Sequence, residues 1–304
     1  MDSANENGLP KIIAVVGTNA SGKSALTVEL ALRFGGEIIS ADSRQVFRGL
    51  DLGSGKITKA EMKGVPHHLI DVCEPNDFFS MADFQRLAYA AADDIIARGK
   101  LPFLAGGTGL YVNSVLDGYL LSDIAPDLEY RNELEKLTTE QLYKMLTEKM
   151  PDLIIDKNNR NRVMRVLEKL HDGDSAVPQK CPRYSSVRLG VSWKREKLLE
   201  RIDERLKRRM DEGMLAETEN LLKNGATPEF LDGLGLEYRY LSRYVLGKSG
   251  SLDETLSELS LAIKRFARRQ MTWFRRDKSI IWLDMEASPL EEAEAAVKAF
   301  LNGN

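Results

Sequence analysis

One short stretch limits what this chain can fold into more than any other. The stretch reads Gly17, Thr18, Asn19, Ala20, Ser21, Gly22, Lys23, Ser24. It fits the phosphate-binding loop pattern, in which a glycine and four free positions precede Gly-Lys-Ser. Glycine permits the positive φ that lets successive backbone N–H groups form a nest around an anion. Lys23 adds a cation, and the Ser24 hydroxyl is a candidate ligand for magnesium. The pattern predicts a pyrophosphate or polyphosphate site without specifying the reaction.

The residues on either side of this loop support the prediction. Residues 11–16 are apolar and rich in Ile and Val, which is typical of a short buried strand. Residues 24–34 predict a helix, because Leu26, Leu30 and Phe34 recur at a spacing of four. That helix would point the positive end of its dipole at the same anion. A glycine-rich turn with a stray lysine is the alternative, and the strand–loop–helix setting disfavours it.

Further patterns predict a parallel α/β sheet. Strand-like runs occupy residues 37–44, 67–72 and 101–105, and a helix pattern over 79–98 separates the last two. In such sheets, ligands bind at the carboxyl ends of the strands. Asp42 lies at such an end, where its carboxylate could hold magnesium through water or accept a proton from a substrate. Capping of the next helix explains an aspartate at this position equally well.

A second glycine-rich turn follows the strand pattern at 101–105. Residues 106–109 read Gly-Gly-Thr-Gly and precede a helix pattern over 110–116. This turn could also approach an anion, with Thr108 offering a hydroxyl at the start of the helix. A plain N-cap is the commoner role for a threonine at this position.

The middle of the chain lacks strand patterns. Three helix patterns follow one another there, at residues 126–137, 139–150 and 160–171. Strand patterns return at 187–193 and again near the C-terminus, before a final helix pattern. We therefore predict an all-helical insertion within a P-loop-type core, a parallel sheet flanked by helices. The predicted ranges are 1–118 and 186–304 for the catalytic core and 119–185 for the insertion.

Two charged stretches of the C-terminal half need separate interpretation. A long helix predicted over 196–223 carries a polar face of mixed sign, which is typical of a solvated surface. The segment 264–278 interleaves basic residues with Phe266, Trp273 and Phe274. Such a mixture suits a nucleic-acid backbone or a polyphosphate. Core aromatics beside a solvated basic face would give the same pattern, and periodicity alone slightly favours that alternative.

Composition narrows the class of protein. The chain has 304 residues, a hydrophobic content of 43% and a net charge of −3. No apolar run approaches the roughly 20 residues that a membrane span needs, and residues 1–10 do not resemble a secretion signal. We expect a soluble cytoplasmic protein that does not bind a membrane. Its two isolated cysteines suggest neither disulfides nor a zinc site. Contacts with nucleic acid must come from local basic patches.

Several blocks together resemble one family. They are the loop at 17–24 and the segments 39–47, 66–71, 105–111 and 268–275. In this order and at these distances they resemble tRNA dimethylallyltransferases, prenyl transferases that modify an adenine beside the anticodon. The blocks span nearly the whole chain.

The resemblance implies a reaction and its partners. A dimethylallyl group would pass from dimethylallyl diphosphate to N6 of the adenine that is 3′-adjacent to the anticodon, in tRNAs reading codons that begin with U. Diphosphate would leave, with Mg²⁺ supporting it. The partner would be the anticodon stem-loop of tRNA, bound by a monomer. The target base would have to leave its stack to reach such a site.

The resemblance also implies roles for individual residues. The loop at 17–24 would hold the diphosphate. Asp42 would accept the amine proton, and Thr108 would donate to the oxygen that bridges the prenyl carbon and phosphorus. Both would lie against the target nucleotide, together with Ser43, Arg44 and Gln45. Arg162 and Arg165 of the helical insertion are candidate contacts to the anticodon arm.

This chain departs from the family pattern at two places. The Gly-Tyr-Lys/Arg-Glu-like block after the long helix is replaced by residues 233–240, and the usual Gly-Thr-Ala-Lys is Gly-Ser-Gly-Lys at 53–56. Two other activities fit the loop at 17–24. They are prenyl transfer to free adenine nucleotide and phosphoryl transfer by a P-loop nucleotide kinase. The helical insertion and the basic segment argue against a small acceptor, which needs neither.

Overall fold

The computed structural model describes residues 8–121, 127–173 and 179–303. Contacts between Cα atoms divide the chain into two compact units. One comprises Met1–Asp117 with Pro182–Asn304, and the other is Gly118–Cys181. The expected helical insertion, 119–185, overlaps the second unit, but residues 182–185 belong to the larger unit.

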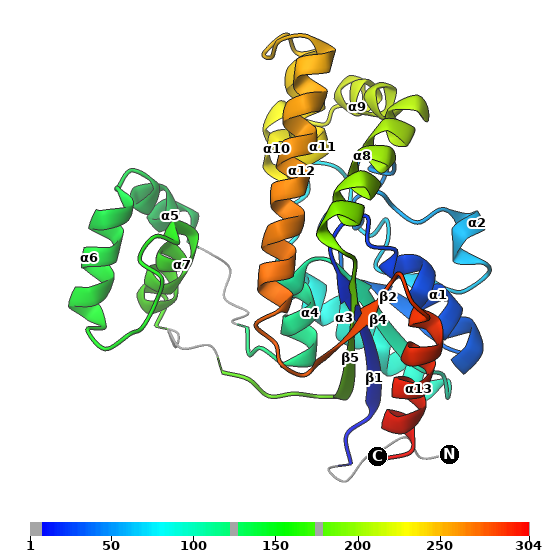
Figure 1. The fold of residues 1–304 in the computed structure, drawn as a ribbon. Helices are drawn as coiled ribbons and strands as arrows, with labels where there is room; N and C mark the ends of the chain where they lie inside the picture. The colour runs from blue at the N-terminus through cyan, green and yellow to red at the C-terminus, as the bar shows by residue number, and fades with distance from the viewer. Residues whose placement is uncertain (1–7, 122–126, 174–178, 304) are drawn as a thin grey trace. The chain divides into compact units, whose positions relative to one another are not determined.

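The larger unit contains a sheet of six parallel strands in the order β3-β2-β4-β1-β5-β6 (Figure 1). The strands are β1 (Lys11–Gly17), β2 (Glu37–Ser40), β3 (His67–His68), β4 (Pro102–Gly106), β5 (Ser185–Ser192) and β6 (Ile280–Asp284). Every residue of β1 is buried, as the continuous apolar run predicts for a strand covered on both faces. Val16 pairs with Gly106, and Ser40 with Ala105. The segments that follow β1, β2 and β4 therefore leave the sheet at one edge.

Helices cover both faces of the sheet. Alternate residues of β1 point to opposite faces. Ile13 and Val15 pack on α1 (Lys23–Phe34) and α13 (Pro289–Leu301), whereas Ala14 and Val16 share a core with α3 (Met81–Ala97) and α4 (Gly109–Leu116). This arrangement confirms the predicted P-loop-type parallel sheet flanked by helices.

A group of helices stands beyond the carboxyl ends of the strands (Figure 1). Its members are α8 (Arg195–Asp211), α9 (Met214–Lys223), α10 (Pro228–Leu234), α11 (Leu236–Val245) and α12 (Leu252–Phe274). Four of them share a core that includes Ile202 of α8, Met214 of α9, Leu241 of α11 and Ile263 of α12, whereas Leu231 of α10 packs in a neighbouring cluster. This group forms one side of the space above the loop at 17–24.

Two predicted elements are wrong in extent. The helix expected over 196–223 is two helices, α8 and α9, because Gly213 between them adopts a left-handed conformation with φ of 102°. The strand expected over 67–72 is only the pair His67–His68, because Leu69 and Asp71 have φ of 62° and 56° and turn the chain away. The helix pattern over 196–223 and the strand pattern over 67–72 did not reveal these changes of backbone direction.

The smaller unit is helical, as predicted. It contains α5 (Leu128–Glu135), α6 (Thr139–Lys149) and α7 (Arg160–His171) around a core of their apolar faces. Arg160 donates hydrogen bonds to the carbonyls of Leu137 and Glu135 at 2.6 and 3.0 Å, and so satisfies carbonyl groups at the C-terminal end of α5. The first residue of the expected helix over 126–137 lies outside the described residues. Among the residues that are described, no helix has the length and apolarity to cross a membrane.

Candidate diphosphate-binding site

The loop between β1 and α1 has the backbone conformation that the glycine pattern predicts. Ala20 and Gly22 have φ of 59° and 85°, both in the left-handed region. The Ser21 hydroxyl donates to the Thr18 carbonyl at 2.8 Å, and Lys23 Nζ donates to the same oxygen at 3.3 Å. Hydrogen bonds within the loop thus stabilise the turn, and α1 begins directly after it with the positive end of its dipole.

Side chains of the β5–α8 region fix this loop from outside. Trp193 Nε1 donates to the Ser21 carbonyl at 2.8 Å, and Arg201 Nε donates to the Ala20 carbonyl at 3.0 Å. The Arg201 guanidinium also lies 4.4 Å from the centre of the Trp193 ring. Because the carbonyls of two successive peptides are held in this way, the orientation of those peptides is set before any anion arrives.

Gln270 of α12 joins the two glycine-rich turns. Its Oε1 accepts from the Asn19 backbone N–H at 2.9 Å, and its Nε2 donates to the Gly107 carbonyl at 2.9 Å. Gln270 is buried within the segment 264–278. This part of α12 therefore organises the site, which neither interpretation of the basic segment predicted.

A cavity of about 270 Å³ opens beside the loop. The predicted residues in its wall are Asn19, Ala20, Ser21, Gly22, Lys23, Ser24, Asp42, Arg44 and Gln45. The structure thus brings the phosphate-binding loop and the segment after β2 to one space. Gly17, Thr18, Ser43 and Thr108 are not part of that wall.

Asp42 and Thr108 lie on two loops that bond to each other. Asp42 Oδ1 accepts from the Arg44 backbone N–H at 2.9 Å. Thr108 Oγ1 accepts from the Ser43 backbone N–H at 3.2 Å, and Thr108 makes no side-chain cap to α4. Thr108 therefore occupies the N-cap position of α4, but its hydroxyl bonds to the Asp42 segment and not to the helix. Asp42 both orders its own turn and faces the cavity.

The cavity wall concentrates positive charge. Burial lowers the pKa of the Lys23 ammonium from 10.5 to about 8; Asp42 opposes this shift, whereas nearby arginines add to it. Burial and the neighbouring Arg209 lower the pKa of Arg205 to about 9. Buried cations that repel one another are stabilised by an incoming anion. The electrostatics of the wall therefore match a polyanion such as a diphosphate.

Arg201, Arg205 and Arg209 of α8 are functional candidates that the sequence interpretation missed. The polar face of this helix was expected to be solvated, and this is wrong for these three residues: they line the cavity, and Arg209 is only 8% exposed. Their spacing of four residues places them on one side of the helix. That spacing was the signal in the sequence, but the acidic and basic residues between them concealed it.

Glu237 is the acidic partner of this cluster. Its carboxylate lies 2.5 Å from Arg44 Nη1 and 3.5 Å from Arg209 Nη1. Burial disfavours the charged form of Arg44, but Glu237 and Asp42 outweigh it and raise the pKa of Arg44. Arg239, in the same divergent block of sequence, instead donates to the Asp232 carbonyl at 2.9 Å and does not line the cavity.

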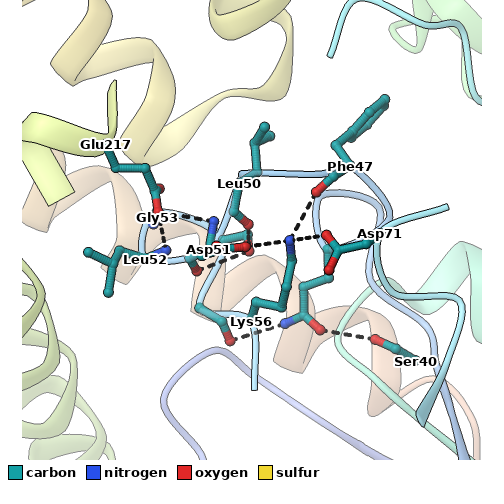
Figure 2. A network of polar contacts seen from close by, with 12 residues as sticks. Ser40, Phe47, Leu50, Asp51, Leu52, Gly53, Lys56, Asp71 and Glu217 are labelled. Atoms are coloured by element: carbon teal, nitrogen blue, oxygen red, sulfur yellow. Dashed lines mark hydrogen bonds and ion pairs between the residues drawn. The ribbon is translucent and has the colours of Figure 1, made fainter. Parts of the chain in front are cut away.

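Figure 2 shows how residues 50–56, next to the cavity, are held from two sides. The Glu217 carboxylate of α9 accepts from the backbone N–H groups of Leu52 and Gly53 at 2.7 and 3.0 Å. From the other side, Lys56 Nζ donates to the Asp71 carboxylate at 2.5 Å. The divergent sequence at 53–56 therefore forms an ordered loop.

Gln45 connects this loop to the sheet and Arg205 connects it to α8. Gln45 Nε2 donates to the Gly55 carbonyl at 3.1 Å, while its Oε1 accepts from the Ser40 hydroxyl at 3.0 Å. Arg205 Nη2 reaches the same Gly55 carbonyl at 3.4 Å. The loop thus positions one of the cavity's arginines.

The two predicted tRNA contacts of the smaller unit lie on α7. Arg162 is exposed, and Arg165 Nη1 bonds to the Glu168 carboxylate at 3.1 Å. The structure therefore presents Arg162 to solvent and ties Arg165 to its own helix. Their contact with an anticodon arm stays a prediction.

Fold and site together define a class of protein. A parallel sheet carries a phosphate-binding loop at its carboxyl edge. The wall of the cavity there combines Lys23 and several arginines with the carboxylates of Asp42, Glu61, Glu204 and Glu237. This is a P-loop-type α/β protein whose cavity beside the loop is lined by clustered cations.

The family follows from the sequence. The chain belongs to the IPP transferase family, whose sequence model matches residues 45–277. A related model, described as isopentenyl transferase, matches residues 10–74.

Individual relatives agree over nearly the full length. The chain is 40% identical to tRNA dimethylallyltransferase 2 of Citrifermentans bemidjiense, covering 94% of each chain. It is 42% identical to tRNA dimethylallyltransferase of Exiguobacterium sp., covering 92% of each. The crystal structure of a tRNA isopentenylpyrophosphate transferase from Bacillus halodurans superposes with a TM-score of 0.75 at 37% identity, covering 96% of this chain and 97% of that one.

Proposed function

We propose that this chain transfers a dimethylallyl group from dimethylallyl diphosphate to N6 of the adenine 3′-adjacent to the anticodon, in tRNAs reading codons that begin with U. Family membership and the full-length similarity to tRNA dimethylallyltransferases support the reaction class. The observation that carries the proposal is that Lys23, Asp42 and the α8 arginines all line the same cavity.

The first task of this cavity is to bind and neutralise the leaving group. Negative charge grows on the diphosphate as its bond to the allylic carbon breaks. Donors that are already oriented toward that charge lower the barrier most. The peptides fixed by Trp193 and Arg201, together with Lys23, supply such donors.

A magnesium ion fits beside these groups. Magnesium binds proteins through one or two oxygen ligands and takes others from substrate phosphates and water. Ser24 and Asp42 line the same cavity and offer a hydroxyl and a carboxylate. In the described part of the chain, no cluster of three or more His, Cys, Asp or Glu residues could form a site without substrate. When bound, the ion would add positive charge where the diphosphate leaves.

The second task is to prepare the nucleophile. We assign Asp42 as the residue that accepts a hydrogen bond, and then the proton, from N6 as nitrogen attacks carbon. One of its oxygens is occupied by the Arg44 backbone N–H, which fixes the direction of the other. Thr108 would donate its hydroxyl hydrogen to the bridging oxygen of the donor while accepting from Ser43.

The acceptor would be tRNA, bound by a monomer. Ser43 lies in the chain between Asp42 and Arg44, which both line the cavity, and Arg44 has further N–H donors beyond the one that meets Glu237. Gln45 is already bonded to Ser40 and Gly55, so we expect it to shape the pocket for the base. Arg162 and Arg165 would contact the anticodon arm.

One experiment tests the reaction and its acceptor together. The protein is incubated with labelled dimethylallyl diphosphate, magnesium and unmodified tRNA, and the tRNA is then digested to nucleosides. We expect label on N6-modified adenosine. Parallel reactions with AMP separate a tRNA enzyme from one that prenylates free nucleotide. Transfer to AMP alone, or phosphoryl transfer from ATP without prenylation, would refute the proposal.

A further inference from the structure

Glu237 places a carboxylate directly against the clustered arginines of the cavity, whose wall also contains Asp42, Glu61 and Glu204. It stands in the first turn of α11 and is only 3% exposed. Its partners Arg44 and Arg209 both line the cavity, together with Lys23. Burial alone would raise the pKa of Glu237, but the two arginines outweigh it and lower that pKa, so the carboxylate is ionised at neutral pH.

The neighbouring residue prevents Glu237 from moving away. The Tyr238 ring is fully buried and packs so closely on Gly53 that a Cβ there would lie 2.6 Å from the ring. The Tyr238 hydroxyl donates to the Glu217 carboxylate at 2.9 Å and accepts from the Ser54 backbone N–H at 3.1 Å. Because α11 is anchored at this point, we expect Glu237 to remain in the pocket when an anion binds.

We propose, on the basis of the function above, that Glu237 is a resident counter-anion of the diphosphate pocket. It holds Arg44 and Arg209 in place when the donor is absent, and it competes with bound diphosphate for their positive charge. The pocket therefore binds diphosphate more weakly than its cations alone would allow. A weaker hold on the leaving group favours its release after transfer.

This role and a purely structural role predict opposite changes in anion affinity when the charge of Glu237 is removed. If Glu237 only positioned the arginines, removing its charge would disorder them and weaken anion binding. If it competes with the ligand, removing its charge strengthens anion binding, because like charges in a partly buried site repel across several ångströms. The affinity for inorganic pyrophosphate therefore separates the two roles.

The test is calorimetric titration of pyrophosphate, at fixed magnesium, into the full chain and into Glu237→Gln, which keeps the shape and removes the charge. We expect the variant to bind pyrophosphate on the order of tenfold more tightly, and to show stronger product inhibition in the transfer assay. Glu237→Asp keeps the charge and should bind within about threefold of the parent chain. Glu219→Gln makes the same chemical change on α9, outside the cavity wall, and is the matched control.

Every result bears on the proposal. Equal or weaker binding by Glu237→Gln, or equal tightening by Glu237→Asp, overturns it while leaving the proposed function intact. Absence of pyrophosphate binding by the parent chain would instead refute the diphosphate site itself. If Glu237→Gln folds only when pyrophosphate is present during purification, as judged by thermal unfolding, the ligand is replacing the lost charge and the proposal stands. If pyrophosphate does not restore folding, the proposal is wrong.

Discussion

Two glycine-rich turns lie at the same edge of the sheet, and Gly22 of the first serves a different physical purpose from the glycines of the second. In the loop at 17–24, Gly22 has φ of 85° and Ala20 shares the left-handed conformation. In the turn at 106–109, none of the three glycines has a positive φ. They are needed because of what surrounds them: a Cβ at Gly106 would lie 2.1 Å from the Ala41 carbonyl oxygen, and one at Gly109 would lie 2.3 Å from the Trp273 ring.

The two turns therefore differ in role: the first lines the cavity, and the second positions neighbouring segments. At Gly22 the first turn uses glycine for backbone conformation, and this turn lines the cavity beside α8. The second uses glycine for close packing and brings Thr108 against the Asp42 segment. A strand–glycine–helix pattern therefore does not by itself indicate an anion site.

Substitution of the lysine in the first turn should have the largest effect. Lys23→Ala removes a cation that no neighbour can replace at that position, and we expect transfer to slow roughly 100- to 1,000-fold. The affinity for tRNA should change little. Steady-state kinetics and filter binding of tRNA measure the two quantities. If tRNA affinity fell as much as the rate, Lys23 would also bind tRNA. The first turn would then not be specific to the diphosphate, and the proposed difference between the turns would be wrong.

Adding one methyl group to each turn sharpens the comparison directly. Gly106→Ala drives a Cβ into the Ala41 backbone, so it should cost about 3 kcal/mol of unfolding free energy. Gly22→Ala forces a left-handed alanine, with an expected cost of about 1–2 kcal/mol, and should also weaken pyrophosphate binding. Denaturant unfolding and calorimetry distinguish the outcomes. Equal stability losses, with pyrophosphate binding impaired in both, would break the comparison.

The hydroxyl of the second turn should matter for rate more than for binding. Thr108→Val removes the group that accepts from Ser43, and we expect kcat to fall about 10- to 100-fold with the KM for the donor nearly unchanged. Thr108→Ser retains the hydroxyl and should recover most of the rate. Loss of stability without this kinetic pattern, measured by thermal unfolding, would assign Thr108 a role in packing alone.

The smallest effect concerns pH. The Lys23 ammonium, with its pKa lowered to about 8, is charged below that pH and neutral above it. Diphosphate prefers the charged form, so the KM for the donor should rise as pH increases through about 8, by no more than about tenfold per pH unit. The KM for tRNA, measured in the same assays, is the internal control. A donor KM that is flat from pH 7 to 9 would exclude Lys23 as the titrating contact.

Elements with strong local signals were predicted within one or two residues of their observed ends. The expected helices at 139–150 and 160–171 correspond to α6 and α7. Thr138 and Asn159 cap them by accepting backbone N–H groups, so short-range hydrogen bonds set where they begin. Errors arose where a single backbone angle decided the outcome, as at Gly213 and Leu69.

The sequence by itself determined the phosphate-binding loop, the alternation of strands and helices, and the family. The conformation of the loop depends on contacts between residues close in the chain, such as Ser21 with Thr18. The tertiary structure alone decided which charged residues meet. Arg44, Arg209 and Glu237 come from three distant segments, and an arginine on a helix has the same spacing whether it faces water or a cavity. Long-range packing decides that question, because burial, not composition, sets whether a charge needs a partner.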